Sequence, residues 1–237
     1  VELLEHVLRD DLNSHARRVM AVLEPLKVVI DNYPQDQVET FEVPYFPGSQ
    51  EGSPTRALPF SREIFIERSD FMEEPPKKFF RLAPGREVRL MNAYYIICTD
   101  VIKNAEGQIV ELHCTYDPNS RGGMTPDGRK VRGTIHWVSA SHALDAEIRL
   151  YDHLFTQPNP YDVPEGSDFK DTVNPDSLQV IKDAKLEPSL ADTEIGESYQ
   201  FMRQGYFCLD SVDSAPGALV FNRTISLVDT WAKMQSA

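Results

Sequence analysis

Short runs in which apolar and polar residues alternate recur along most of this chain, and they leave few fold classes open. Leu26, Val28 and Ile30 alternate in this way, as do Ile64 and Ile66. Side chains at every second position share one face of a β-strand, so this period predicts strands. Further strand-like runs lie at 87–103, 108–116, 131–137, 147–151, 178–181, 199–202, 206–209 and 220–227.

Turn-forming sequences separate these runs. Asn-Ala-Glu-Gly at 104–107 predicts a hairpin, and Pro-Asp-Gly at 126–128 predicts a second turn. Residues 44–62 and 156–174 are rich in proline, glycine and polar residues, which is typical of loops. The pattern as a whole predicts a mainly β protein, built as one or two antiparallel β-barrels.

The N-terminal residues follow a different period. Leu4, Leu8 and Leu12 recur at every fourth position, which predicts an amphipathic helix. No capping residue precedes Val1, so we expect the chain to begin inside a longer protein. A second helical stretch is predicted at 15–23. We therefore expect the end of a helical connector at 1–24 and β-barrels at 25–237, where strands from both ends of the chain can share one barrel.

Composition narrows the class of protein. Of 237 residues, 41% are hydrophobic and 26% are charged, as in ordinary globular proteins. No run approaches the roughly 20 apolar residues of a membrane span, and no signal peptide is recognisable. Cys98, Cys114 and Cys208 are far apart in strand-like runs, which indicates buried reduced thiols in a cytoplasmic protein. The net charge of −13 disfavours binding of nucleic acid by bulk charge, although a small positive surface remains compatible with it.

Motifs of catalytic sites are missing. The sequence contains neither G-x-x-x-x-G-K nor G-x-G-x-x-G, and it has no G-x-S-x-G elbow. His113 and His136 lie in alternating strand-like runs, where hydrogen-bonded or exposed histidines are far commoner than metal ligands. Adjacent acids such as Glu73 and Glu74 point apart on a strand or helix. We expect no catalytic residue, metal or cofactor in this chain.

Two groups of cationic and amide residues are candidates for contact with RNA. Arg129 and Lys130 directly follow the turn at 126–128, so they lie near a hairpin tip that can enter a splayed RNA loop or simply keep the barrel end soluble. Gln200 and Arg203 can donate hydrogen bonds to base edges. Because they are three residues apart, they face one RNA only if a bulge or loop intervenes, whereas Phe201 between them is expected in the core.

Arg68 is a further candidate. It continues the apolar face of Ile64 and Ile66 at its end, where an arginine is either a contact at the barrel mouth or the partner of an acid such as Asp70. The basic and aromatic residues at 77–81 form a weaker candidate, because an ordinary amphipathic turn has the same composition.

The segments taken together resemble the C-terminal anticodon-binding region of bacterial glutaminyl-tRNA synthetases. The resemblance is in order over essentially the whole chain, and the runs Ile-His-Trp-Val-Ser-Ala at 135–140 and Glu-Ile-Arg-Leu-Tyr-Asp at 147–152 are highly specific. Other matching stretches are 19–22, 25–28, 30–33, 60–61, 64–71, 87–94, 114–117, 127–131, 159–160, 205–210, 220–224 and 229–233.

This resemblance implies a helical connector followed by two β-barrels of the kind found in ribosomal protein L25. It also implies that the barrels hold the splayed anticodon bases of glutamine tRNA. The positions that resemble the family's contacts with the anticodon stem-loop are Arg68, Arg129, Gln200, Arg203 and Thr230, to which Lys130 is added by its location as a phosphate contact. Met202 and Val228 depart from the family, because an acidic and a basic residue can occur at these positions.

The family also sets expectations beyond this chain. Its members are class I ligases that use ATP with Mg²⁺ in an N-terminal catalytic domain, and the H-x-G-H-like and K-M-S-K-S-like signatures of that domain are missing here. We therefore expect a cytoplasmic monomer that binds tRNA, no DNA and no membrane, and that is inactive alone. The alternatives are the corresponding region of a glutamyl-tRNA synthetase, a protein- or carbohydrate-binding module, and a hydrolase with two carboxylates.

Overall fold

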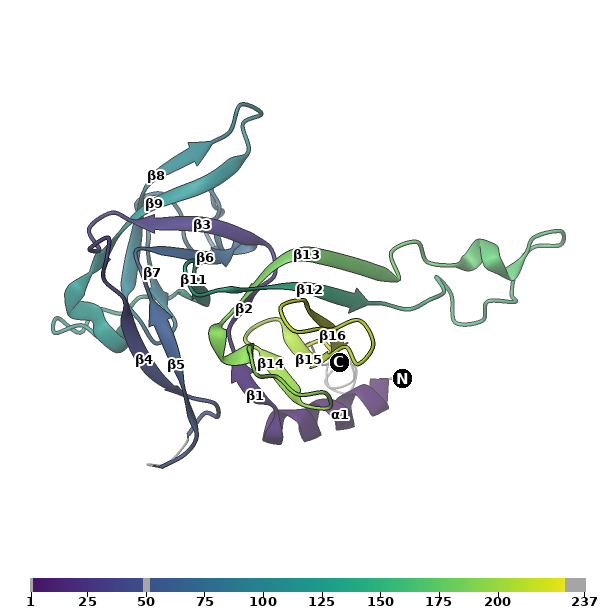
Figure 1. Ribbon diagram of the computed structural model, residues 1–237. Coiled ribbons are helices and arrows are strands. Elements are labelled where there is room, and N and C mark those ends of the chain that lie inside the picture. The colour runs from purple at the N-terminus through teal and green to yellow at the C-terminus, as the bar shows by residue number, and fades with distance from the viewer. Residues whose placement is uncertain (1, 49–51, 229–237) are drawn as a thin grey trace.

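The computed structural model describes residues 2–48 and 52–228, which form two β-barrels and an N-terminal helix (Figure 1). The expectation of a mainly β fold with two barrels after a short helix is confirmed. Helix α1 (Glu2–His15) buries Leu12 against Tyr206 and Ile225 of the second barrel. Leu4 and Val7, nearer its start, are exposed, so only part of its apolar face is covered in this chain.

The first barrel is a seven-stranded sheet. Its strands, in spatial order, are β10 (Thr134–Ile135), β7 (Glu87–Leu90), β8 (Tyr95–Lys103), β9 (Ile109–Asp117), β3 (Pro25–Ile30), β6 (Glu63–Glu67) and β11 (Trp137–Ser139). The two edge strands, β10 and β11, are consecutive in sequence and only His136 lies between them. The chain itself therefore joins the two edges and nearly closes the sheet.

The second barrel closes in the same way. Its strands, in spatial order, are β1 (Arg17–Val19), β14 (Ser198–Phe201), β15 (Gly205–Leu209), β16 (Leu219–Ile225), β12 (Leu144–Tyr151), β13 (Leu178–Leu186) and β2 (Ala21–Val22). Met20 is the single residue between the edge strands β1 and β2. We call such a residue, which joins the two edge strands of a barrel, the seam residue. The side chain of Met20 packs in the hydrophobic core of the first barrel, so the seam residue of the second barrel attaches it to the first.

Most neighbouring strands are antiparallel, as expected, and each barrel also contains two parallel pairs. In the first barrel these are β3 with β9 and β7 with β10, and in the second they are β1 with β14 and β12 with β16. Parallel neighbours need long connections, and the connection from β1 to β14 contains every strand of the first barrel.

Two local predictions are wrong. The stretch at 15–23 is not helical, because α1 ends at His15 and residues 17–19 and 21–22 pair with β14 and β13. Pairing and burial of this segment outweigh its local helical pattern. The predicted loop at 44–62 contains β5 (Thr55–Phe60), which pairs with β4 (Glu39–Pro44) in a separate two-stranded sheet. Prolines are tolerated there because a two-stranded ribbon has an open edge on both strands.

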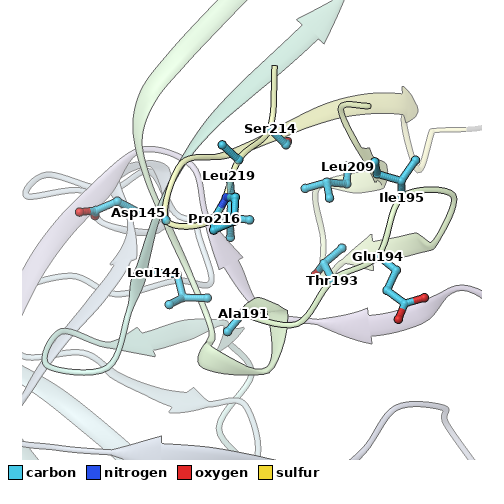
Figure 2. A pocket seen from close by; sticks show the side chains of 12 residues that line it. Leu144, Asp145, Ala191, Thr193, Glu194, Ile195, Leu209, Ser214, Pro216 and Leu219 are labelled. Carbon is cyan, nitrogen blue, oxygen red and sulfur yellow. The ribbon is translucent and has the colours of Figure 1, made fainter. Parts of the chain in front are cut away.

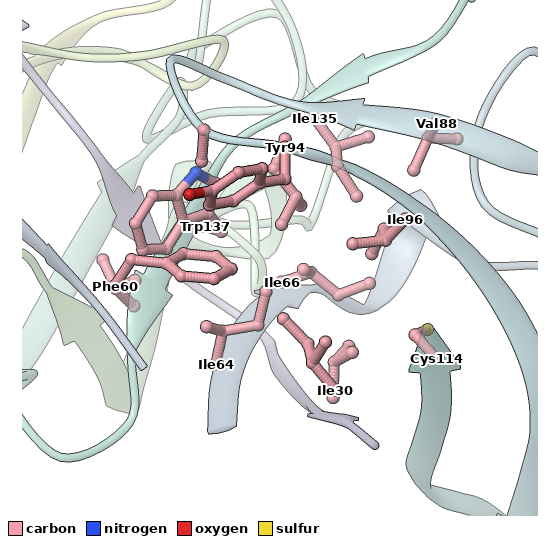
Figure 3. Packing of buried hydrophobic residues seen from close by; sticks show 14 of the residues in the cluster. Ile30, Phe60, Ile64, Ile66, Val88, Tyr94, Ile96, Cys114, Ile135 and Trp137 are labelled. Atoms are coloured by element: carbon pink, nitrogen blue, oxygen red, sulfur yellow. The ribbon is translucent and has the colours of Figure 1, made fainter. Parts of the chain in front are cut away.

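The core of the first barrel combines a group of aromatic rings, Phe60, Tyr94 and Trp137, with aliphatic side chains (Figure 3). The ring centroids of Phe60 and Trp137 lie 5.0 Å apart at an interplanar angle of 87°, an edge-to-face contact. The Trp137 indole Nε1 donates to the Met91 carbonyl at 2.9 Å, so its polar atom is satisfied inside the core. The alternating positions Ile64 and Ile66 are fully buried here, as their spacing predicts.

Beyond the second barrel, β12 and β13 continue into the segment at 152–177, which projects away from the rest of the chain (Figure 1). The predicted polar connector lies in this arm, and a 3-10 helix, η3 (Phe169–Thr172), is its regular element.

Two of the three cysteines are buried, as predicted. Cys98 and Cys114 are buried opposite each other on β8 and β9 and are free, whereas Cys208 is free but only half-buried. Across residues 2–48 and 52–228, no helix is both long and apolar enough to cross a membrane. Within the same ranges, no three His, Cys, Asp or Glu side chains converge as metal ligands.

Candidate nucleic-acid interface

Arg203 lies where the two barrels meet. It occupies the turn between β14 and β15, and its guanidinium reaches across to η1 (Arg68–Asp70) of the first barrel. Nη1 donates to Asp70 Oδ2 at 2.5 Å and Nη2 donates to Asp70 Oδ1 at 2.6 Å. Nη1 also lies 3.1 Å from His136 Nδ1, the seam residue of the first barrel. The hydrogen bonds to Asp70 raise the pKa of Arg203 above its ordinary value.

Asp70 is fully buried and holds a second arginine. Arg81 Nε lies 3.2 Å from Asp70 Oδ1, and Arg81 Nη1 donates to the Ser69 carbonyl at 3.1 Å. One carboxylate of the first barrel thus gathers a guanidinium from each barrel. Arg68 does not provide this pairing: its guanidinium is exposed and donates to the carbonyls of Ile109 at 2.8 Å and Pro25 at 3.4 Å.

A second buried acid, Glu67, ties the junction together. Its Oε1 accepts from the Leu23 amide at 2.6 Å and from Gln204 Nε2 at 2.7 Å. His136 Nε2 lies 3.4 Å from the same oxygen, yet it makes no hydrogen bond with the described part of the chain. Nδ1 of His136 faces the donating guanidinium of Arg203, a contact that only the tautomer with its proton on Nε2 can accept.

Gln200 lies on a different face of the same hairpin. Its Nε2 is 3.5 Å from the Tyr206 hydroxyl, and its neighbour on β1 is Arg18. Arg18 Nη2 donates to Asn13 Oδ1 of helix α1 at 2.8 Å. Gln200 and Arg203 do not share one regular strand, because Gln200 belongs to β14 and Arg203 lies in the turn that follows it. The expected core position of Phe201 is confirmed, since it is fully buried.

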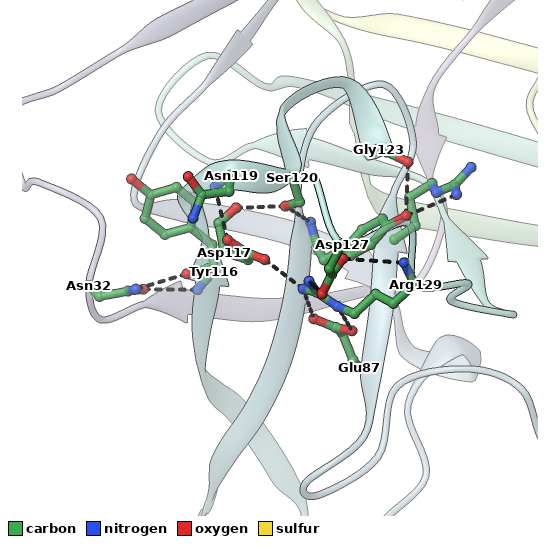
Figure 4. A network of polar contacts seen from close by, with 11 residues as sticks. Asn32, Glu87, Tyr116, Asp117, Asn119, Ser120, Gly123, Asp127 and Arg129 are labelled. Carbon is green, nitrogen blue, oxygen red and sulfur yellow. Dashed lines mark hydrogen bonds and ion pairs between the residues drawn. The ribbon is translucent and has the colours of Figure 1, made fainter. Parts of the chain in front are cut away.

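Arg129 is enclosed by carboxylates (Figure 4). Its guanidinium donates from Nε and Nη2 to Glu87 at 3.0 and 2.8 Å, from Nη2 to Asp117 at 2.6 Å and from Nη1 to Asp127 at 3.0 Å. It also lies over the ring of Tyr95, 5.2 Å from the centroid. The hydrogen bond from Arg129 lowers the pKa of Asp117. Three acids around one cation leave little positive charge for a phosphate.

Lys130 is exposed beside further basic residues. With Lys77, Arg86 and Arg132 it lines a pocket whose aromatic member is Phe80 and whose one acid is Glu87. The Arg132 guanidinium lies over the Phe80 ring, 5.2 Å from its centroid. The group at 77–81 was a weaker candidate from sequence, and its proximity to residues 130–132 became visible only in the folded chain. Positive charge is thus concentrated locally in a chain whose net charge is −13.

The apolar cavity in the second barrel has a different character (Figure 2). It measures about 590 Å³ and is lined by side chains such as Leu144, Leu209 and Leu219. Its charged residues are the acids Asp145 and Glu194, so it does not suit a phosphate. Among the candidates from sequence, Thr230 lies outside the described residues.

Sequence reasoning missed that Asp70 and His136 contact Arg203. Asp70 was considered only as a partner of Arg68, and no local pattern identified Glu67 or His136 as its neighbours. Met202, which departs from the family pattern, packs against the hydrophobic core of the first barrel and so docks the turn that carries Arg203.

Comparison with known proteins agrees with this geometry. Residues 16–117 and residues 134–210 match two families, each described as the anticodon-binding domain of class I tRNA synthetases (E and Q). Together the two matches cover more than half of the chain, and each centres on one of the barrels.

The curated relatives are longer proteins. A glutamine–tRNA ligase from Nitrobacter winogradskyi is 53% identical over 237 residues, which are 100% of this chain and 41% of that ligase. One from Pseudomonas putida is 53% identical over 98% of this chain and 40% of the ligase. One from Clostridium kluyveri is 51% identical over 95% of this chain and 40% of the ligase. The chain therefore spans about two fifths of their length and belongs to the anticodon-binding region of the class I glutamyl- and glutaminyl-tRNA synthetase family.

Proposed function

We propose that this chain recognises the anticodon stem-loop of glutamine tRNA within a glutamine–tRNA ligase. The observation that carries the proposal is the placement of Arg203 at the junction of the barrels, where it is held by Asp70 and still partly exposed, with 27% of its side chain accessible. A guanidinium has five N–H donors, and its contacts with Asp70 and His136 use three of them. The other two can bond to a base edge.

Glutamine tRNA is favoured over glutamate tRNA because the relatives that cover this chain carry the name glutamine–tRNA ligase. The corresponding region of a glutamyl-tRNA synthetase is the second candidate, since the matching families include both specificities.

The other sequence candidates take complementary parts in this proposal. Gln200 contributes an amide beside Arg18, and Arg68 contributes an exposed guanidinium at the barrel rim. Lys130 contacts phosphate, which fits its position among exposed basic residues. Arg129 reaches RNA only by exchanging its carboxylate partners for phosphate. Thr230 is retained as a candidate on the resemblance of its position to the family's anticodon contacts.

The ligase reaction itself lies outside the proposal for this chain. ATP and Mg²⁺ serve the catalytic part of such a ligase, and we assign no residue here to them. We propose that the whole protein is cytoplasmic and monomeric and that this chain alone attaches no amino acid to tRNA.

Fluorescence anisotropy with labelled RNA stem-loops tests the proposal. The loops carry a glutamine anticodon (CUG), a glutamate anticodon (UUC) or a scrambled one, and a DNA stem-loop serves as a control. We expect the tightest binding with CUG and the weakest with DNA. Equal binding of all four, or preference for the glutamate anticodon, would contradict the proposed specificity.

A further inference from the structure

We propose that Asp70 is a positioning residue for anticodon recognition, which fixes the arginines of both barrels in one orientation toward the RNA. This inference rests on the proposed function and adds a specificity role for a residue that was not among the candidates for contact with RNA. Asp70 itself is fully buried and so does not reach the RNA. It acts through Arg203 and Arg81.

The geometry of the Arg203 contact supports this role. Both terminal nitrogens of the guanidinium donate to the two oxygens of one carboxylate, at 2.5 and 2.6 Å. Such a fork fixes the plane of the guanidinium, whereas a single hydrogen bond leaves it free to rotate. His136 Nδ1 adds a third contact at 3.1 Å. The remaining donors, on Nε and Nη2, are therefore held at one angle, as readout of a base edge requires.

The backbone of Arg203 gives independent support. Its φ angle is +69°, in the left-handed region that residues other than glycine rarely occupy. A conformation of this kind persists when its surroundings hold it, and such residues cluster at functional sites. Two contacts across the junction hold this one: Met202 packs in the core of the first barrel, and the guanidinium pairs with Asp70.

Charge explains why an acid is needed at this position. Arg203 and Arg81 converge on one point, and without Asp70 two like charges would face each other there. The carboxylate of Asp70 neutralises one of these two cations. Since Asp70 belongs to the first barrel and Arg203 to the second, the pair also sets the approach of Arg203 relative to the first barrel.

A second buried ion pair in the chain shows how the Asp70–Arg203 pair differs from one with a purely structural role. Glu187, which follows β13 of the second barrel, pairs with Arg56 of the two-stranded β4–β5 sheet, and their side chains are 0% and 3% exposed. Neither can present a donor to a ligand. At the Asp70 cluster the acid is equally buried, but the Arg203 and Arg81 side chains are 27% and 43% exposed. The cluster thus has a fixed buried side and an accessible cationic side.

The test is Asp70→Asn in the 237-residue chain, measured with a CUG stem-loop and three stem-loops that each carry one changed anticodon base. Asparagine has nearly the same shape, but it removes the charge and replaces one acceptor with a donor. We expect discrimination at one anticodon base to fall by about tenfold or more, the scale of one bidentate base contact. Arg203→Gln should abolish discrimination at the same base, and Asp70→Asn added to it should cause no further loss.

Glu187→Gln is the matched control, since it perturbs another buried acid between the barrels. It should lower the urea midpoint and leave discrimination unchanged. If Asp70→Asn does not fold, His136→Leu removes the third contact of the Arg203 guanidinium and should weaken discrimination at the base that Arg203→Gln identifies. A folded Asp70→Asn chain, or a His136→Leu chain in that case, with wild-type discrimination would overturn the inference. Failure of the wild-type chain to discriminate would instead count against the proposed function.

Discussion

Replacement of Glu187 by glutamine should destabilise the contact between the barrels. The Glu187 carboxylate accepts from the Met20 amide at 2.7 Å, from Ser189 Oγ at 2.5 Å and from Arg56 Nε. These partners come from the seam of the second barrel, from the segment after β13 and from β5. Glutamine loses the charge that compensates Arg56, which is buried and cannot reach water.

The loss of unfolding free energy in Glu187→Gln depends on the contacts that Arg56 keeps. Loss of one partner of a buried ion pair typically costs about 3–5 kcal/mol. Arg56 still donates from Nη1 to the Pro44 carbonyl at 2.9 Å and lies over the Tyr45 ring, 5.3 Å from its centroid. These contacts place the expected loss near the lower limit, at about 3 kcal/mol. With a urea m-value of about 3 kcal/mol/M for a chain of this size, the midpoint should fall by about 1 M.

Urea unfolding followed by tryptophan fluorescence and by circular dichroism measures this change. Arg56→Met in the Glu187→Gln background removes the unpaired cation and should recover a large part of the loss, because an apolar side chain of similar length can occupy the buried site. A midpoint shift of less than about 0.3 M for Glu187→Gln, or no recovery in the double variant, would refute the assignment of a strong buried pair.

Three further predictions follow from the described contacts. Lys130→Ala should weaken the binding of all RNA stem-loops equally and reduce the slope of log affinity against log salt by about 0.7–1. Fluorescence anisotropy at several salt concentrations measures this slope. A loss of affinity confined to one anticodon would contradict a phosphate contact. Nδ1 of His113 lies 2.9 Å from Oδ1 of Asp31, and this hydrogen bond is the chief cause of the raised pKa of His113. The interaction therefore stabilises the folded chain fully below the ordinary histidine pKa of 6.5, and this stabilisation is lost as the pH rises through the raised pKa. An NMR titration should show a lower pKa of His113 in the Asp31→Asn variant. Trp137→Phe should cost about 2–4 kcal/mol in urea unfolding, since it leaves a small cavity and an unpaired Met91 carbonyl; a cost below 1 kcal/mol would argue against a tightly packed core.

Local patterns predicted the elements that depend on neighbours in sequence. The helix from the period of Leu4, Leu8 and Leu12, and the strands around Ile64 and Ile66, formed where expected. The helix predicted at 15–23 was wrong, because strands β1 and β2 gain their stability from partners about 160–180 residues away in the chain. No short window of sequence contains that information.

The candidate site also combines features that the sequence predicted with features that only the folded chain shows. Residue chemistry and the family resemblance pointed to Arg203, and only the folded chain showed that Asp70 holds it. The sequence also placed Arg129 and Lys130 together near a hairpin tip, which is wrong, because both lie in an irregular segment between the 3-10 helix at 118–123 and β10. The structure separates their environments, because Arg129 is enclosed by three carboxylates whereas Lys130 stays exposed.

The sequence by itself therefore determined the mainly β class, the period of the strands and the family of this chain, since these depend on side-chain alternation and on the order of residues. The tertiary structure alone decided which strand segments close each barrel and which charges meet. Closure depends on single seam residues, Met20 and His136, that join distant edges. The charge of an arginine becomes available or is cancelled according to the acids that folding brings beside it, and Asp70 and Glu87 come from segments that lie far from their arginines in sequence.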